Sequence, residues 1–217
     1  MKRILLGCFL AMTAVSAPAQ TVRDSVLYVG GERIADDAYR GRGDFREVVV
    51  LEGVKVIGQN AFRECANLRK VTLPEGLEDI KQFAFIYCRG LEEIDFPMTL
   101  THIGSNVFSE CQSLKEAILP DSLTELESYV FSGCTSLGYV RLPNNPKMLG
   151  ELIFNGCYAL RLIDEPSPVP PTFDCASFPF DPLEADKMQS LTLRVPAVSV
   201  AAYRSAPGWN LIPNIEK

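Results

Sequence analysis

Apolar positions along the chain recur with a period of 23 residues. Two columns show this best, a phenylalanine and a cysteine three positions later, and no insertion breaks their spacing. The phenylalanines are Phe62, Phe85, Phe108, Phe131 and Phe154, and the cysteines are Cys65, Cys88, Cys111, Cys134 and Cys157. A fixed period of about 20 to 50 residues is typical of stacked structural units that each contact mainly their two neighbours. The sequence therefore predicts a solenoid.

Each unit is predicted to hold one short strand and one return segment. In the first copy, residues 68–74 alternate apolar and polar positions in their second half and end in a proline, which cannot donate a hydrogen bond to a neighbouring strand. Stacking would join these strands into one parallel sheet. The remainder, residues 57–65, is too short for a full helix, so we expect extended segments, tight turns or single helical turns. The phenylalanines would then form a buried aromatic column.

Five regular units span residues 57–166, and both flanks are predicted to close the stack. A worn copy of the pattern places Arg42 in the cysteine slot, so residues 20–56 are expected to form an N-terminal strand and a degenerate capping repeat. Residues 167–217 are expected to form a C-terminal cap, which would cover the open end of the sheet. There residues 191–195 alternate as a last strand, and Ser199 can N-cap a short helix that ends before Pro207.

These columns resemble the leucine-rich repeats of the BspA-like surface proteins of Bacteroidetes and treponemes, whose unit carries the same Ile-Gly, Ala-Phe, Cys, Leu and Leu-Pro positions. The match covers residues 34–166, and the tail resembles the C-terminal cap of that family. The resemblance implies an α/β repeat solenoid, a right-handed leucine-rich-repeat superhelix with one parallel sheet and short irregular return segments. It also implies a secreted or surface protein that binds other proteins, including host matrix components, or mediates adhesion between cells.

Residues 1–19 are predicted to be a signal peptide. Lys2 and Arg3 precede an apolar run of about twelve residues, and small residues at 17–19 suit cleavage before Gln20. The run is shorter than the roughly 20 residues that a membrane-spanning helix needs, and no later segment could span a membrane. Residues 5–8 look like a lipidation box, but cleavage at Cys8 would leave too short a leader. The mature chain is therefore expected to be exported, to the cell surface or the extracellular space, with the periplasm as an alternative.

Composition and charge narrow the partners. The chain is 47% hydrophobic, enough for a packed core. Its formal net charge is −6 and becomes −8 once Lys2 and Arg3 are removed, because the leader holds no Asp or Glu. An acidic chain with no basic run argues against nucleic acid and against electrostatic docking on anionic lipid.

The cysteines are predicted to be buried free thiols, although export would permit disulfides. Equivalent residues of adjacent units lie about 4.8 Å apart, but their side chains point in parallel where a disulfide needs them to converge. A bridge between Cys157 and Cys175 is the alternative. A zinc site is not expected, since four ligands must meet at one metal and the column spreads its sulfurs along the stack.

No enzyme activity and no cofactor are predicted. Cysteine or serine catalysis usually needs a base to activate the nucleophile, and His102 is the one histidine. Its column holds Asp79, Glu125 and Met148, unrelated residues that predict a solvent-exposed position. Carboxylate pairs on a repeat surface are expected to be solvated, and the columns show no cleft with convergent acid and base groups.

The outward face of the predicted sheet is the expected recognition surface, because solenoids bind through strand positions that point out. Two outward columns are acidic at their centre and then turn apolar and aromatic. The candidate ligand-binding residues are Glu93, Asp95, Glu116, Ile118, Tyr139 and Arg141. Tyrosine and arginine are common hot-spot residues, so we expect a protein ligand with basic groups over the acidic part and an apolar group near Tyr139. The alternative is a merely solvated sheet face.

Arg42, Gly43 and Asp44 spell the tripeptide that integrins recognise. The same residues can simply fill a turn of the worn repeat, where glycines permit tight backbone geometry. Integrin binding is therefore a separate hypothesis.

Taken together, the sequence predicts an exported protein-binding or adhesion module for a protein ligand, either a host matrix protein or a bacterial surface protein. The alternative is a non-adhesive structural component of the cell envelope that binds bacterial proteins or glycans.

Overall fold

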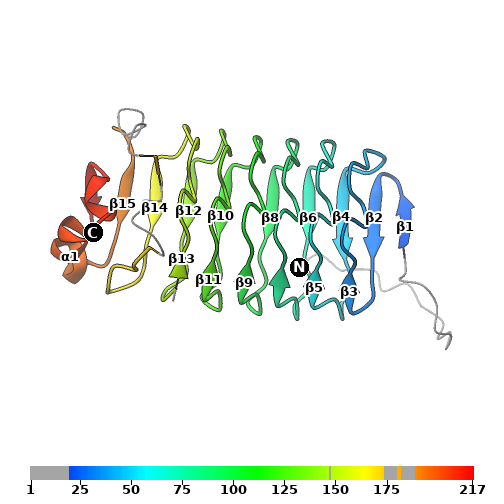
Figure 1. The fold of residues 1–217 in the computed structure, drawn as a ribbon, viewed down its shortest axis with the longest axis horizontal. Coiled ribbons are helices and arrows are strands. Elements are labelled where there is room, and N and C mark those ends of the chain that lie inside the picture. The colour runs from blue at the N-terminus through cyan, green and yellow to red at the C-terminus, as the bar shows by residue number, and fades with distance from the viewer. Residues whose placement is uncertain (1–19, 147, 174–179, 182–188) are drawn as a thin grey trace, which may run out of the picture.

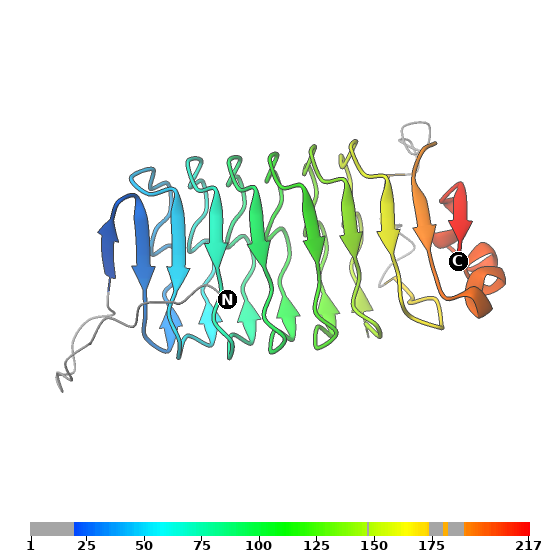
Figure 2. The same cartoon turned by 180° about the vertical axis from the view of Figure 1, so that it is seen from behind.

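The computed structural model describes residues 20–146, 148–173, 180–181 and 189–217. The predicted signal peptide and Cys175 lie outside the described residues. The strands stand side by side in one long row, with the N-terminal strands at one end and a small helical cap at the other (Figures 1 and 2). The fold is the predicted solenoid of stacked units, with little helix.

The longer strands, together with those of the two ends, form one row along the stack, which we call the main face. They are β1 (Gln20–Arg23), β2 (Val26–Val29), β4 (Glu47–Val50), β6 (Lys70–Thr72), β8 (Glu93–Asp95), β10 (Glu116–Ile118), β12 (Tyr139–Arg141), β14 (Leu162–Asp164), β15 (Thr192–Arg194) and β16 (Asn214–Glu216). Pairing is parallel throughout, except that β1 runs antiparallel to β2. The register between units follows the repeat, so that Lys70 pairs with Glu93.

The return segments carry a second parallel sheet, built from two-residue strands. They are β3 (Arg33–Ile34), β5 (Val56–Ile57), β7 (Asp79–Ile80), β9 (His102–Ile103), β11 (Glu125–Leu126) and β13 (Met148–Leu149). The prediction of one sheet with irregular return segments was therefore too simple. Backbone groups inside a stack need hydrogen-bond partners. The two-residue strands β5 and β7, which end in the buried Ile57 and Ile80, satisfy this need by pairing with each other across adjacent units.

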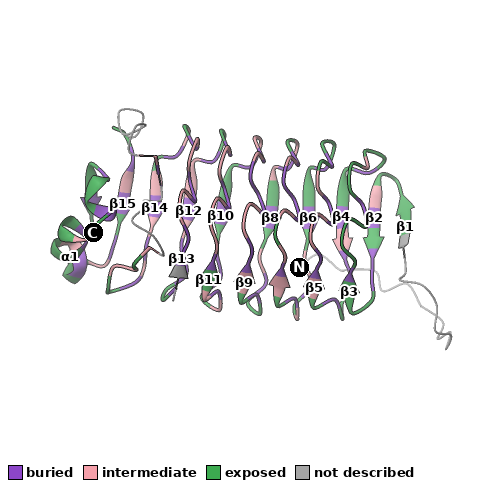
Figure 3. Ribbon diagram, in the orientation of Figure 1, coloured by how far each residue is buried: buried purple, intermediate pink, exposed green. Residues whose placement is uncertain are grey.

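Side chains alternate between the interior and the surface along the main-face strands (Figure 3). In β6, β8 and β10 the middle residue is buried and both of its neighbours are exposed. This is the period of two that a half-buried strand requires. The outward positions of these strands therefore form a continuous surface, as the sequence predicted.

The predicted aromatic column is confirmed. Tyr39 and the five repeat phenylalanines are buried and stack nearly parallel along the whole array. Successive ring centroids are separated by 5.0 Å for Tyr39 and Phe62, 5.1 Å for Phe62 and Phe85, 5.6 Å for Phe85 and Phe108, 5.6 Å for Phe108 and Phe131, and 6.0 Å for Phe131 and Phe154. Offset stacking at such distances is a favourable aromatic geometry.

The cysteine column also lies in the core, and Cys65, Cys88, Cys111 and Cys134 are buried free thiols as predicted. Each repeat cysteine donates its S–H to the backbone carbonyl 26 residues earlier, at Sγ···O distances of 3.1 to 3.3 Å. Burial raises the pKa of the thiols of Cys88, Cys111 and Cys134, so they stay protonated and remain donors. The cysteines therefore link consecutive units by hydrogen bonds.

One turn position in each repeat requires a left-handed backbone. Gly133 holds it with a φ of +75° and Gly156 with a φ of +74°, whereas Glu110 and Tyr87 adopt the same conformation without the freedom of glycine. A left-handed non-glycine residue carries steric strain from its Cβ atom. Packing of the turns in the stack thus imposes a left-handed backbone on residues that would not favour it on their own.

The C-terminal cap contains η2 (Ala197–Ser199), α1 (Val200–Ser205) and η3 (Trp209–Leu211). The predicted last strand and short helix are present, but the capping role of Ser199 needs correction. Its side chain makes no cap hydrogen bond, and its hydroxyl donates to the carbonyl of Pro168 at 2.7 Å. Ser199 therefore ties the helix to the chain that follows the last repeat. Within the described residues, no helix is both long and apolar enough to cross a membrane.

Candidate functional site

The six predicted ligand-binding residues lie together on the main face, at the outward positions of β8, β10 and β12. Glu93, Asp95, Glu116 and Ile118 are exposed, while Tyr139 and Arg141 are half-buried. The strands of these residues are consecutive in the row (Figure 1). We call this surface the central face.

The acidic part of the central face is only partly neutralised. Glu93 forms an ion pair with Lys70 at 3.1 Å. Asp95 and Glu116 have neither an ion pair nor a side-chain hydrogen bond among the residues that the structure describes. Two exposed carboxylates on neighbouring strands therefore have no ion-pair partner among the described residues, which favours a cationic partner at this point.

The aromatic and basic part of the central face is tied down by internal contacts. The Tyr139 hydroxyl donates to Oδ2 of Asp164 at 3.3 Å. Nη1 of Arg141 donates to the carbonyl of Leu119 at 3.1 Å and pairs with Oδ1 of Asp121 at 3.0 Å. The hydrogen bond from Arg141 to the Asp121 carboxylate lowers the pKa of Asp121, so the ion pair stays charged. Tyr139 and Arg141 thus form a fixed polar border rather than free contact groups.

The strand pairing of the main face is interrupted between β8 and β10. The two strands are neighbours, yet β8 ends one sheet and β10 begins the next. If they paired in the register of the other repeats, Glu93 would stand opposite Glu116, and like charges placed opposite each other destabilise a strand pair. The break therefore coincides with the acidic centre of the predicted site.

The core changes at the same junction. Phe96 takes a slot that holds leucine at Leu73, Leu119 and Leu142 and glutamate at Glu165 in the last repeat. Its ring meets Phe108 edge-on with centroids 5.6 Å apart. Ala117 takes a slot otherwise filled by valine or isoleucine. A larger residue at one position and a smaller one at the next keep the interior filled, since cores tolerate substitutions that conserve volume.

An apolar hollow of about 280 Å³ opens beside the break. Its lining residues are Phe96, Met98, Ile118, Leu119, Pro120, Asp121 and Arg141. Met98 is 61% exposed and Ile118 is 51% exposed, so two apolar side chains face solvent at its mouth. The sequence analysis missed Phe96 and Met98. Both could have been noticed, because each departs from its column, Met98 from the positions that hold Glu75 and Asp121 in the neighbouring repeats.

The integrin-type tripeptide lies far along the stack, in the worn N-terminal repeat. Its two charges bind each other: Arg42 donates to both carboxylate oxygens of Asp44, at 3.0 and 2.6 Å. The arginine also covers the rings of Tyr39 and Phe45, at 5.6 and 5.5 Å from their centroids. A ligand would have to separate this pair, so the geometry favours the structural interpretation of the tripeptide.

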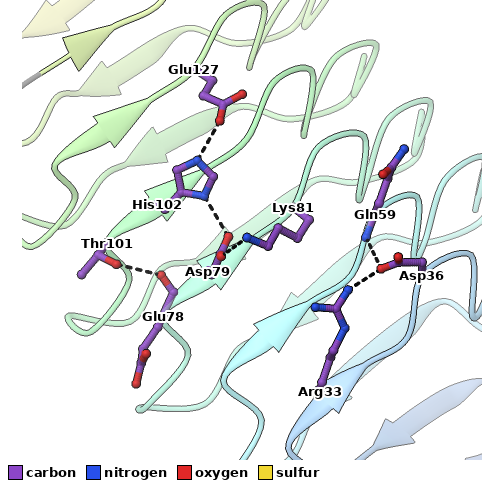
Figure 4. A network of polar contacts seen from close by, with 9 residues as sticks. All are labelled: Arg33, Asp36, Gln59, Glu78, Asp79, Lys81, Thr101, His102 and Glu127. Atoms are coloured by element: carbon purple, nitrogen blue, oxygen red, sulfur yellow. Dashed lines mark hydrogen bonds and ion pairs between the residues drawn. The ribbon is translucent and has the colours of Figure 1, made fainter.

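The second sheet carries a polar network around His102 (Figure 4). Nδ1 of His102 lies 2.8 Å from Asp79, and Nε2 lies 2.8 Å from Glu127. The expectation of a solvent-exposed histidine is wrong, because the side chain is only 23% exposed. Column comparison missed Glu127, which reaches His102 from the following unit. Burial acts to lower the pKa of His102, but the hydrogen bonds to Asp79 and Glu127 outweigh it and raise the pKa.

In this network, the serine is not hydrogen-bonded to the histidine, as a nucleophile activated by a base would be. The Ser105 hydroxyl donates to Glu127 at 2.6 Å, and His102 contacts the other oxygen of the same carboxylate. The carboxylate of Glu127 therefore holds the serine hydroxyl, and among the described residues the imidazole makes no hydrogen bond to the serine that would activate it. A hollow of about 450 Å³ lies beside the network, but its charges are paired internally, Arg33 with Asp36 and Lys81 with Asp79. Recognition of a charged ligand there would require breaking existing pairs.

Glu165 is a second unusual group, at the junction between the last repeat and the cap. It is fully buried, and its Oε1 accepts a hydrogen bond from the backbone N–H of Ser167 at 2.9 Å. Its Oε2 has no partner among the described residues. Burial raises the pKa of Glu165 to about 8, so the carboxyl is mostly protonated at neutral pH. It is a structural feature of the cap and lies outside the central face.

Comparison with known proteins gives a consistent result. A BspA type leucine rich repeat region matches residues 32–161 in 6 copies, which is more than half of the chain. None of the curated proteins matches the chain. Among solved structures, a leucine rich repeat protein of T. pallidum is 30% identical, with a TM-score of 0.61 over 70% of this chain and 81% of its own.

Two further solved structures are longer than this chain. A leucine rich cell surface protein of Faecalibacterium prausnitzii is 25% identical with a TM-score of 0.58, covering 73% of this chain and 48% of its own. A leucine-rich repeat protein of Bacteroides ovatus is 20% identical with a TM-score of 0.61, covering 94% of this chain and 52% of its own, and supports the fold alone. The chain spans about half the length of these two proteins.

Proposed function

The chain belongs to the BspA-type leucine-rich-repeat family, and from this premise we propose that it is an exported protein-binding module whose binding surface is the central face. Repeats of this family form protein-interaction modules, and members are typically not enzymes. What remains to be assigned is the surface used, the kind of partner and the place where binding occurs.

One observation carries the assignment to the central face: Asp95 and Glu116 lie exposed and without an ion pair beside an apolar hollow. Elsewhere on the outer surface, many carboxylates are neutralised by neighbouring repeats, as Glu92 is by Arg69 and Lys115 at 2.6 and 3.1 Å. Carboxylates without an ion pair next to apolar surface suit a protein partner, because interface cores are apolar and charge complementarity selects the partner. The ligand would present basic groups to the carboxylates.

Export is part of the proposal and is supported by the leader-like residues 1–19. The F. prausnitzii protein with a similar fold is a cell surface protein. A host matrix protein is the proposed ligand, with adhesion as the role. A bacterial envelope protein or glycan is the alternative that the experiment separates.

The experiment measures binding of the purified chain from residue 20 onward, which contains every described element, to a panel of matrix proteins, glycans and bacterial envelope extracts. Beside it runs the double variant Asp95→Lys with Glu116→Lys, whose sites are exposed and not paired. The control variant, Glu52→Lys with Glu75→Lys, makes the same charge change at exposed turn positions.

Saturable binding to a matrix protein, lost in the central-face variant and kept in the control, would establish an adhesin and its surface. Binding to envelope extract alone would favour the structural role. Equal binding by all three proteins would place the site elsewhere.

A further inference from the structure

The break between β8 and β10 makes the central face unlike the rest of the main face. At every other junction of the five repeats, neighbouring outer strands pair. At this one, Ile118 pairs with Arg141 on one side, and within the described residues it has no strand partner on the side of β8. The ladder is therefore open at the point where the hollow lies.

The size and lining of the hollow indicate what it can hold. Its volume of about 280 Å³ lies just below the range of roughly 300 to 1,000 Å³ that is usual for small-molecule sites. Its walls are mostly apolar, with Met98 and Ile118 exposed at the mouth. One aliphatic side chain would bury this apolar surface. A polar molecule would find few partners in the hollow, because the charges of Asp121 and Arg141 already pair with each other.

The charges around the hollow select the neighbours of that side chain. Asp95 is the outward residue at the end of β8, and Glu116 begins β10. In an extended peptide, side chains at alternate positions point to the same face. A basic residue two positions before or after the aliphatic one would thus face the same surface. A second copy of this chain fits poorly, because the chain carries a net negative charge.

We propose that the hollow at the C-terminal ends of β8 and β10 is an anchor site for one aliphatic side chain of an extended peptide segment, flanked at alternate positions by lysine or arginine residues that pair with Asp95 and Glu116. The inference rests on the proposed function, since it names the recognition element that the central face takes from a protein partner. It also moves the apolar contact from Tyr139, where the sequence placed it, to Met98 and Ile118.

The test uses a short synthetic peptide, acetyl-Lys-Thr-Leu-Thr-Lys-amide, and NMR spectra of the chain with labelled methionine and isoleucine methyl groups. The peptide should shift the methyl signals of Met98 and Ile118. Replacing its leucine by serine, or its two lysines by glutamates, should weaken binding at least about tenfold, as expected when a buried apolar contact or its charge complement is lost. Unchanged Met98 and Ile118 signals at millimolar peptide, or equal shifts with all three peptides, would overturn the proposal.

A second variant separates this inference from the proposed function. Met98→Gln with Ile118→Thr makes the mouth of the hollow polar and keeps every charge, while Val198→Thr is the control at an exposed valine in the cap. Whole-protein ligand binding should fall at least about tenfold in the first variant and stay unchanged in the second. If ligand binding is lost in the Asp95→Lys and Glu116→Lys variant but kept in the Met98→Gln and Ile118→Thr variant, the central face binds the ligand and the anchor is wrong.

Discussion

The buried aromatic column is expected to contribute strongly to the free energy of unfolding, and Phe108 is the residue at which to test this. Phe108 is fully buried at the middle of the array. It stacks on Phe85 and Phe131 with centroid distances of 5.6 Å on each side, and Phe96 meets it edge-on at 5.6 Å. Phe108→Ala would remove all three ring contacts and leave a cavity in the centre of the stack.

The magnitude follows from these contacts. Truncation of a buried phenylalanine to alanine costs about 3 to 5 kcal/mol, and each aromatic pair contributes about 0.5 to 1.5 kcal/mol beyond area burial. With three rings lost as partners, Phe108→Ala should lie near the upper end, at about 5 kcal/mol. Phe108→Leu conserves much of the volume and should cost less than about half of that.

Urea unfolding with two probes measures both the loss and its spread. Trp209 is the chain's one tryptophan and is buried in the cap, with its Nε1 donating to the carbonyl of Pro171 at 2.8 Å. Its fluorescence reports the C-terminal end, whereas circular dichroism reports the whole stack. In a stack held together by contacts between neighbouring units, the two transitions should coincide in the parent chain and should separate in Phe108→Ala. Coincident transitions with a loss below about 1 kcal/mol would refute the role of the column.

Three further predictions concern single groups. Gly133→Ala should destabilise the chain by about 1 to 2 kcal/mol in urea unfolding because of its φ of +75°, while Gly138→Ala, whose Cβ would meet nothing closer than 3.8 Å, should cost little; equal losses would contradict the turn argument. The folded-state pKa of His102 is raised, so its stabilisation is present below the unfolded pKa of about 6.5 and is lost as pH rises through the folded pKa; the deficit of His102→Gln should therefore be larger at pH 5.5 than at pH 8, and a constant deficit would contradict the contacts with both carboxylates. Glu165 has its pKa raised to about 8, so stability falls as pH rises from the unfolded value of about 4.3 toward 8, and Glu165→Gln should be more stable than the parent at pH 8 but not at pH 4; a gain that does not depend on pH would count against a buried, protonated carboxyl.

The repeat, its strands and both core columns could be predicted from the sequence, because packing in a stack demands the same residue type at the same place in every unit. Phe62 recurs because each phenylalanine stacks on its equivalent in the next unit, and Cys65 recurs because each cysteine donates to a carbonyl of the unit before it. The second sheet was not predicted, since strands of two residues, such as Asp79–Ile80, are too short to show an alternating pattern.

Contacts between columns were the other limit of the sequence analysis. His102 looked exposed because its own column is irregular, and the partner that covers it, Glu127, belongs to a different column. The central face shows the same limit: the outward residues could be identified one column at a time, but the hollow arises from Phe96 and Met98, which lie beyond the end of β8. Residues that depart from their column, rather than those that agree with it, mark the positions where this chain differs from a regular repeat stack.

The most direct test of the account is photo-crosslinking of the bound ligand from two positions. A photo-crosslinking amino acid replaces Ile118 on the central face in one protein and Val198 in the cap in another, both being exposed apolar sites. The account predicts that the ligand identified in the binding panel crosslinks from position 118 and not from position 198. Crosslinking from position 198 alone would contradict the assignment of binding to the central face.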